Sequence, residues 1–489
     1  MVVMERLSRG AAAMRLGMRL ALGCTLASVM AGCVSTPGSR TQAVKPVSAY
    51  QSSLSLSPTQ GEAADWPTDQ WWLAYGDSQL DTLVDQALAG SPSVAAAMAR
   101  LREAQAMEQE SGAALKPGVT AKASVDKEKQ SYNYLFPQSY VPKGWEAAGL
   151  GSLSLNWDLD LWGKNRAALA AATSDAQAAQ ADAAEARLVL ATSVVNAYAD
   201  LARLFAERDC DVAALKVRTQ TAELFGKRRE QGLETSGSVD QAIARREASE
   251  AALHATDESI ALARNRIAAL LGAGPDRGLS ITRPSVGATQ KHGLPSNLTL
   301  NLLGRRPDIV VARLRAQAAS KRIDAAKAEF YPDINLSAVI GVQSLGLNML
   351  MKSGSAYGSV GPAISLPIFS GGRLQGQYRS AQAKYDEAVA SYDDTLVKAL
   401  RELADATVSE RELLPRLDAT RAASQAAARA HDSILARYQG GLTNYLNVLS
   451  AEDSLIDADR QLADLEARAF SLDVALVRAL GGGFQAQPQ

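Results

Sequence analysis

The chain has 489 residues, with 51 Lys and Arg against 52 Asp and Glu, which gives a formal net charge of −1. This balance excludes an electrostatic case for nucleic acid as a partner, because nucleic-acid binders carry clustered positive charge. Length alone would suggest about three domains at ~150 residues each. Hydrophobic residues make up 47% of the chain but aromatic residues only 5%, which reflects abundant alanine and favours close packing of helices.

Residues 1–32 have the pattern of a secretory signal peptide. Four arginines precede an uncharged apolar run from Leu20 to Met30, and the next residues, Ala31-Gly32-Cys33, complete a segment that is similar to a bacterial lipobox. Cleavage before Cys33 would leave a terminal cysteine that carries N-palmitoyl and S-diacylglycerol groups. Cys24, the rival site, follows too short an apolar run, and plain secretion without lipid is the alternative reading. Residues 33–70 are then a lipidated tether.

The stretch from Ala167 to Gln231 contains no proline and a single glycine. A continuous helix over these residues would be roughly 98 Å long, whereas helices in globular domains average ~11–12 residues. Apolar residues at heptad spacing predict packing along another long helix; they are Leu188 and Val195, and Tyr198, Phe205 and Val212. Turn residues then interrupt the pattern, which resumes from Val239 to Leu271. We therefore predict a long helical hairpin at 167–271.

The same order of elements returns in the second half of the chain. A second long helical hairpin is predicted at 373–480, with Arg373 matching Arg166 and Gly440 matching Gly232. Upstream of the hairpins, two prolines 25 residues apart occur in each half, at Pro92 and Pro117 and at Pro307 and Pro332, with a helical pattern between them. An internal duplication follows from these landmarks. Its parts are a first repeat at 71–284, a linker at 285–306, a second repeat at 307–483 and a C-terminal tail at 484–489.

Alternation with a period of two marks an extended region in each repeat. From Leu153 to Leu161 every odd position is apolar and every even position is polar, which predicts a strand between a dry and a wet face. Leu155 and Leu159 belong to the apolar row and Ser154 to the polar one. With weaker alternation from Val119 to Val125, this predicts a β-hairpin at 117–162.

The second extended region alternates in the same way and predicts a β-hairpin at 332–369. A transmembrane helix at 334–351 is the alternative, because those residues carry no charge. Their polar residues and the parallel with the first repeat favour strands. Each chain thus offers four strands, whereas a closed transmembrane barrel needs at least ~8 and an open sheet edge cannot face lipid. Three chains would supply twelve.

In their order and spacing these features resemble the TolC-like outer membrane factors, in particular their lipidated, NodT- and OprM-like branch. The resemblance covers the chain from Trp71 to Gly483. It rests on the Cys33 lipobox, the duplication and four further segments: Pro307-Asp308-Ile309, Pro367-Ile368-Phe369-Ser370-Gly371-Gly372-Arg373, Arg437-Tyr438-Gln439-Gly440-Gly441 and Ala479-Leu480-Gly481-Gly482-Gly483.

The resemblance implies an α+β membrane protein, in which four transmembrane β-strands per chain form a trimeric β-barrel continued by a periplasmic α-barrel. It implies a location in the outer membrane and a role as the exit duct of a tripartite efflux pump for drugs or other small molecules. The expected partners are two further copies of the chain, a periplasmic adaptor, an inner-membrane RND-type transporter and outer membrane lipid. Heavy-metal efflux or type I protein secretion remain open as alternatives.

The resemblance also implies functional residues at the periplasmic end. The turns of the hairpins are expected to dock the adaptor, and residues around the second turn to line a closed aperture. The docking residues are Gly232, Gly440 and Gly441, and the aperture residues are Tyr438, Thr443, Asn447 and Ser450. Members of the family place carboxylates at the positions of Asn447 and Ser450, whereas the nearest acids here are Glu452 and Asp453.

The sequence offers little for catalysis or for a metal or other cofactor. Its three histidines, His254, His292 and His431, lie at no metal-ligand spacing, and the chain lacks a Walker loop and a nucleophile elbow. A Ser-x-x-Lys match at 124–127 arises easily by chance. A periplasmic coiled-coil adaptor would explain the helical hairpins but not four amphipathic strands. We therefore expect a channel without enzymatic activity and without a cofactor other than the lipid on Cys33.

Overall fold

The computed structural model describes residues 42–43, 45–46, 49–50, 65–133, 137–285, 295 and 303–486. The expected signal peptide, Cys33 and most of the linker at 285–306 lie outside these residues. The chain divides into two compact units, which are described separately here. The first contains the strands with the adjoining ends of the helices, and the second contains both helical turns.

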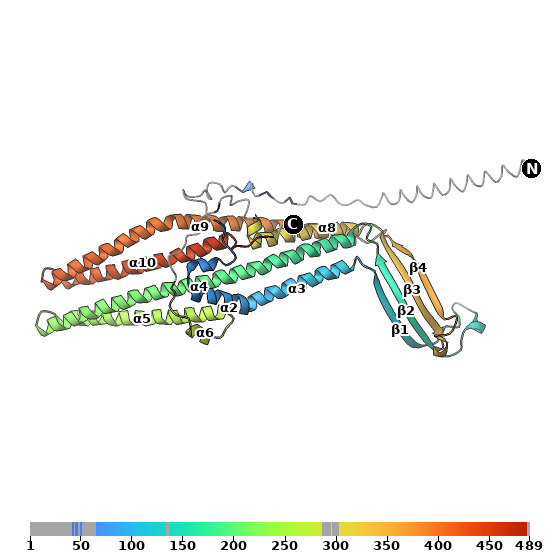
Figure 1. Cartoon of the computed structure of the whole chain (residues 1–489), viewed down its shortest axis with the longest axis horizontal. Coiled ribbons are helices and arrows are strands. Elements are labelled where there is room, and N and C mark those ends of the chain that lie inside the picture. The colour runs from blue at the N-terminus through green and yellow to red at the C-terminus, as the bar shows by residue number, and fades with distance from the viewer. Residues whose placement is uncertain are drawn as a thin grey trace, which may run out of the picture. The chain divides into compact units, whose positions relative to one another are not determined.

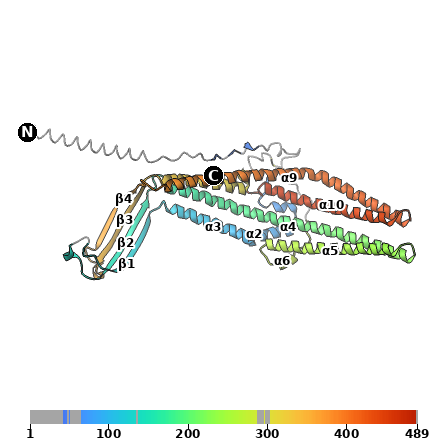
Figure 2. The same ribbon diagram turned by 180° about the vertical axis from the view of Figure 1, so that it is seen from behind.

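The two repeats contain helices of equal length (Figures 1 and 2). Helices α3 (Pro92–Ala113) and α8 (Pro307–Ala328) have 22 residues each. Helices α4 (Lys164–Glu230) and α9 (Arg373–Gln439) have 67 each, and α5 (Ser236–Leu270) and α10 (Tyr445–Ala479) have 35 each. The duplication that the sequence predicts is confirmed.

Equal helix lengths correct the alignment of the two repeats. From the start of α4 and α9 (373 − 164 = 209) to the end of α5 and α10 (479 − 270 = 209), the offset is constant. The predicted pairs Arg166 with Arg373 and Gly232 with Gly440 were therefore wrong by two residues and by one. Gly232 corresponds to Gly441, and Gln231 corresponds to Gly440.

Four antiparallel strands form one sheet in the order β1-β2-β3-β4 (Figure 1). They are β1 (Gly118–Glu128), β2 (Glu146–Asp158), β3 (Asp333–Leu345) and β4 (Ala356–Ser365). The pairing of β2 with β3 joins the two repeats within the sheet. Strands β1 and β4 lie at its edges, so each has one side that pairs with no other described strand of this chain. The predicted strand at 334–340 is confirmed.

One face of this sheet is apolar. Val119, Leu155, Ala338 and Val360 stand opposite one another across all four strands, and such partners share a face. Val119 is 67% exposed and Val360 is 79% exposed, so no described part of the chain covers them. The other face is richer in polar residues, among them Thr120, Lys122, Ser152, Ser154, Asn156, Ser337 and Gln343. The predicted division into an apolar and a polar face is confirmed.

Both hairpins are shorter than predicted. Strand β2 ends at Asp158, and Asp160 adopts a left-handed backbone with φ 43°. The carboxylate of Asp160 accepts hydrogen bonds from the backbone N–H groups of Asn165 and Arg166, both at 2.9 Å, so it caps the start of α4. Leu159 therefore lies beyond the strand and not in its apolar row. Strand β4 ends at Ser365, shortly before Pro367, which has no N–H for a ladder.

Aromatic residues begin the core of the second unit. Trp71, Trp72 and Tyr75 are buried in the 3-10 helix η2 (Trp71–Tyr75), as the sequence predicts, and precede α2 (Ser78–Gly90). The hydroxyl of Tyr198 in α4 donates to the carboxylate of Asp77 at 2.6 Å, and Asp77 caps α2. Helix α4 has an apolar window long enough to cross a membrane, but that window is mostly buried in the protein, as in a core helix.

The predicted apolar seam of α4 is confirmed only in part. Leu188, Val195 and Tyr198 are buried, and Phe205 packs against the core as a partly buried residue. Val212, one heptad further on, is 42% exposed. The seam therefore holds the middle of α4, and other residues pack the helix near its end.

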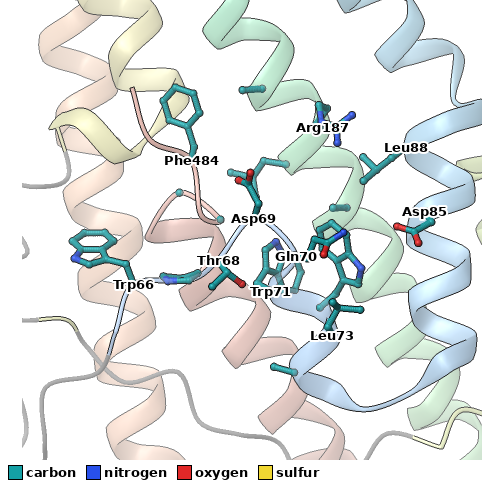
Figure 3. A pocket seen from close by; sticks show the side chains of 18 of the residues that line it. Trp66, Thr68, Asp69, Gln70, Trp71, Leu73, Asp85, Leu88, Arg187 and Phe484 are labelled. Carbon is teal, nitrogen blue, oxygen red and sulfur yellow. The ribbon is translucent and has the colours of Figure 1, made fainter. Parts of the chain in front are cut away.

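The C-terminal segment packs closely on the segment before η2. Gly481, Gly482 and Gly483 all have positive φ, and a Cβ on Gly483 would lie 2.3 Å from the carbonyl carbon of Thr68. Residues 65–74 and 481–484 line a pocket together with parts of α2 and α4, and Figure 3 shows Arg187, Asp85 and Phe484 around it. The glycines thus allow the end of the chain to hold the segment that follows the predicted tether.

Candidate functional site: the turns of the helical hairpins

The two turns between the long helices have the same backbone geometry. Gly232 has φ 71° and Gly441 has φ 72°. Leu233 donates its N–H to the carbonyl of Arg228 at 2.9 Å, and Leu442 donates to Arg437 at 2.8 Å. This is the Schellman ending of a helix, in which glycine supplies the left-handed residue. The sequence therefore specifies a glycine at 232 and at 441 for a conformational reason.

Gly440 does not share this reason. Its φ is not in the left-handed region, and an added Cβ would meet the Ala436 carbonyl oxygen at 3.6 Å, an ordinary contact. The expectation that Gly440 supplies the reversal was wrong, because the alignment of the repeats was shifted by one residue. Gly441 takes its place as the glycine that forms the second turn.

Each return helix begins with a capping side chain. The Thr235 hydroxyl accepts a hydrogen bond from the Ser238 N–H at 3.2 Å, and the Asn444 carbonyl oxygen accepts one from the Asn447 N–H at 3.2 Å. The Asn447 amide also donates to the Thr443 hydroxyl at 2.8 Å. Two of the predicted aperture residues, Thr443 and Asn447, are thus brought together at the start of α10.

An aromatic cluster joins the two hairpins just behind the turns. Phe225 of α4 lies with its ring centroid 5.6 Å from that of Tyr438 and 3.9 Å from that of Tyr445, and the Phe225 and Tyr438 rings are nearly parallel. Val448 and Leu449 of α10 complete the apolar side of this cluster. Because Phe225 comes from the first repeat and both tyrosines come from the second, this cluster fixes one hairpin against the other.

Tyr438 is buried in this cluster, with 3% of its surface exposed, and makes a polar contact at its tip. Its hydroxyl donates a 2.6 Å hydrogen bond to Oε1 of Glu234, and the Arg228 guanidinium lies 4.7 Å from its ring centroid. Burial raises the pKa of Tyr438, and the hydrogen bond and charge of Glu234 raise it further, so the hydroxyl stays protonated as a donor. Tyr438 therefore acts within the chain as a tie between the turns.

Charged residues form a second link one to two helical turns behind the tips. Asp453 of α10 accepts hydrogen bonds from Arg218 of α4 at 3.0 Å and from Arg245 of α5 at 2.8 Å. Glu452 is only 1% exposed and accepts a 2.6 Å hydrogen bond from the Thr221 hydroxyl. Both acids nearest to the predicted aperture are thus engaged inside the chain.

The remaining predicted positions are exposed. Ser450 is exposed, and its carbonyl oxygen accepts a hydrogen bond from the Ser454 hydroxyl at 2.8 Å. Leu233, Leu442 and Leu446 at the turns are 60%, 72% and 64% exposed, so each tip presents apolar surface to its surroundings. Within the described ranges no three His, Cys, Asp or Glu side chains are grouped to hold a metal ion.

Sequence reasoning missed the residues that connect the hairpins, in particular Phe225, Glu234, Arg218 and Arg245. The constant offset of 209 would have placed Glu234 opposite Thr443 (443 − 234 = 209), at a position already singled out. The contacts themselves could not be derived from it, because the two repeats differ here: Tyr438 corresponds to Arg229.

Comparison with known proteins gives a consistent result. Residues 83–273 and 298–482 match the family described as outer membrane efflux protein. The chain is 36% identical over 359 residues to the fusaric acid resistance protein FusA of Burkholderia cepacia, covering 73% of this chain and 67% of that protein. It is 31% identical over 465 residues to the multidrug resistance outer membrane protein MdtP of Escherichia coli K12, covering 88% and 92%.

The fold also matches a solved structure. The crystal structure of the outer membrane protein VceC from Vibrio cholerae superposes with a TM-score of 0.82 and 48% sequence identity, covering 86% of this chain and 100% of VceC.

Proposed function

Because the chain belongs to the outer membrane efflux protein family, we propose that three copies of it form the exit duct of a tripartite pump. The relatives are outer membrane channels, and this chain acts in the outer membrane as an efflux channel and reaches into the periplasm. The duct receives small molecules from a periplasmic adaptor and an inner-membrane RND-type transporter. Its role is passive conduction, and it catalyses no reaction.

The observation that carries this proposal is the sheet. Its four strands present one exposed apolar face and two edges without a partner in the described chain. Unpaired edges cannot face lipid, whereas pairing β4 of one copy with β1 of the next closes a ring of twelve strands. The apolar face then meets lipid and the polar face lines the lumen. The trimer is thus required by the same feature that places the sheet in a membrane.

The helical turns support docking of an adaptor. Both tips have the same backbone geometry and expose a leucine at the corresponding position, Leu233 and Leu442. Three copies would therefore present six similar apolar tips, a repeated surface for a repeated partner. The ties from Tyr438 to Glu234 and from Asp453 to Arg218 and Arg245 hold the two hairpins of one chain together and keep the aperture narrow at rest.

The names of the relatives favour small organic molecules as cargo, because they refer to fusaric acid and to multiple drugs. The test is complementation of a bacterial strain that lacks its own outer membrane efflux channels. The chain is expressed with the adaptor and transporter encoded beside it, and drug susceptibility is compared with that of a Leu155→Arg variant. We expect resistance from the wild-type chain only, and a trimer mass in detergent. A monomeric or dimeric mass, or assembled trimers that confer no resistance, would contradict the proposal.

A further inference from the structure

Charges at the loop end of the first hairpin are divided between the two faces of the sheet. Lys127 stands opposite Ala147 on the apolar face, in the same row as Val125 and Val119. Asp126 and the facing pair Glu128 and Glu146 belong to the polar face. The cation and the anions at this rim thus project to opposite sides.

Two further residues continue the apolar row. Lys129 and Trp145 each lie one residue beyond the last registered pair, Glu128 with Glu146, so by alternation they belong to the face of Lys127. Trp145 is 67% exposed, and both lysines are exposed. The apolar face therefore ends at this rim in two lysines and a tryptophan.

The lysines of this rim are available for a partner. Neither Lys127 nor Lys129 forms an ion pair with any described residue. The Lys129 ammonium lies 5.8 Å from the ring centroid of Tyr132, whose hydroxyl accepts a hydrogen bond from the Gly144 N–H at 3.0 Å. That bond holds the start of the loop against its end, and the ring beside Lys129 leaves the charge itself unneutralised.

The spacing of aromatic residues places this rim at a membrane surface. At the helix end of the same sheet, Trp162 stacks on Tyr331 with centroids 4.9 Å apart, and Trp157 ends the apolar row of β2. Trp145 and Trp157 are twelve residues apart (157 − 145 = 12), or roughly 40 Å along a strand at ~3.3 Å per residue. A strand tilt of ~40° reduces this to about 30 Å across the membrane, close to an apolar band flanked by two aromatic girdles.

We propose that Lys127, Lys129 and Trp145 form a binding surface for the phosphate groups of lipids in the outer leaflet of the outer membrane. This inference rests on the proposed barrel, because only the lipid-facing side of a barrel brings the three side chains to lipid headgroups. The ammonium groups reach the phosphates while their carbon stems lie along apolar surface, and the Trp145 ring lies at the interface. Asp126, Glu128 and Glu146, which would repel phosphate, lie on the lumen side.

The experiment measures lipid binding to the full-length trimer. Purified trimers are titrated with lipid A, with fully dephosphorylated lipid A and with inorganic phosphate, and bound lipid is counted by native mass spectrometry. The variant is Lys127→Gln with Lys129→Gln. Lys122→Gln is the matched control, because Lys122 lies on the polar face of the same strand. Lys127→Arg with Lys129→Arg keeps both charges.

We expect the double glutamine variant to lose about tenfold in affinity for lipid A, since each cation near an anionic surface contributes appreciably. The control and the arginine variant should bind as the wild type does, and dephosphorylated lipid should bind equally weakly to all four proteins. Equal loss in Lys122→Gln, equal binding of the dephosphorylated lipid by the wild type, or displacement of lipid A by equimolar inorganic phosphate would overturn the inference. The variants should still form trimers and export drugs, so a failure of this surface is distinguishable from a failure of the channel.

Discussion

The hydroxyl of Tyr438 donates a 2.6 Å hydrogen bond to Oε1 of Glu234, and this bond joins the end of α9 to the turn that follows α4. The two hairpins come from different repeats, so any movement of one away from the other must break this contact. Phe225 and Arg228 hold the tyrosine ring on both sides. The bond therefore lies where the opening of a trimeric aperture would begin.

Replacing Tyr438 by phenylalanine should weaken this tie and leave the stacked ring in place. Loss of a hydrogen bond to a charged acceptor costs about 1–3 kcal/mol, so the closed arrangement of the hairpins should be less favoured. We expect increased single-channel conductance in planar bilayers and greater sensitivity of cells to large antibiotics that the outer membrane normally excludes.

Tyr445→Phe is the matched control for that variant. Tyr445 belongs to the same cluster, but its buried hydroxyl has no hydrogen-bond partner among the described residues. Removing it should leave conductance unchanged. Equal effects of the two substitutions would show that ring packing, and not the bond to Glu234, holds the hairpins together.

Cys33→Ser tests the predicted lipid attachment, which lies outside the described residues. Metabolic labelling with a radioactive fatty acid should mark the wild-type protein and not the variant. Drug export should be partly retained, because a barrel inserts without the lipid and the lipid adds a second attachment. Label that persists in Cys33→Ser would place the modification elsewhere.

Two neighbouring residues of β2 test the assignment of the faces. Leu155 belongs to the apolar row and Ser154 to the polar row. Leu155→Arg should lower the free energy of insertion by ~2–4 kcal/mol if it lies near the middle of the bilayer, and should reduce the amount of trimer in outer membrane fractions. Ser154→Arg should be tolerated at the lumen. The opposite ranking would exchange the lipid and lumen faces.

The fold could be predicted from sequence to a large extent because its signals are long. A stretch of 65 residues without proline, two proline pairs and a nine-residue alternation each survive small errors. The ends of the strands could not be predicted in the same way. Leu159 and Leu161 continue the alternation, yet Asp160 is held in a left-handed conformation by its role as a cap for α4. A side-chain cap won over a periodic pattern there.

The site was predicted less well, because its contacts join residues that are far apart in the chain. Tyr438 and Glu234 are separated by 204 positions, and no spacing in the sequence indicates their bond. The turn glycine was misplaced for a simpler reason. In Gln439-Gly440-Gly441 either glycine could form the reversal, and only the backbone angles show that Gly441 does.

Glu452 should make stability depend on pH. Burial raises the pKa of its carboxyl group, and the Thr221 hydrogen bond offsets this only in part. A folded-state pKa above the unfolded value means that the group favours the folded state when protonated. Its contribution is full below the unfolded pKa and is lost as pH rises through the folded pKa. Glu452→Gln should therefore raise the melting temperature of the trimer at pH 7, and the difference should vanish toward pH 4. A variant less stable than the wild type at pH 7 would contradict this account.

The last prediction concerns the docking role of the second turn, for which the structure provides a matched pair of glycines. At Gly441 a side chain is disfavoured by φ 72°, at a cost of roughly 1–2 kcal/mol for a non-glycine residue in this conformation. Gly441→Val should therefore distort the turn and displace the exposed Leu442, while the sheet and the aromatic cluster keep the trimer assembled. We expect normal trimer mass and membrane insertion but loss of drug export and of cross-linking to the adaptor.

Gly440→Val places the same side chain one residue earlier, where the backbone is not left-handed and the nearest atom lies at 3.6 Å. It should export nearly as well as the wild type. Gly232→Val, in the first turn, should weaken docking less than Gly441→Val, because Asn447 and Ser450 follow the second turn. Normal export by Gly441→Val would refute a docking role for this turn, and so would equal loss in Gly440→Val and Gly441→Val, since only one of the two glycines has a conformation that a side chain must disturb.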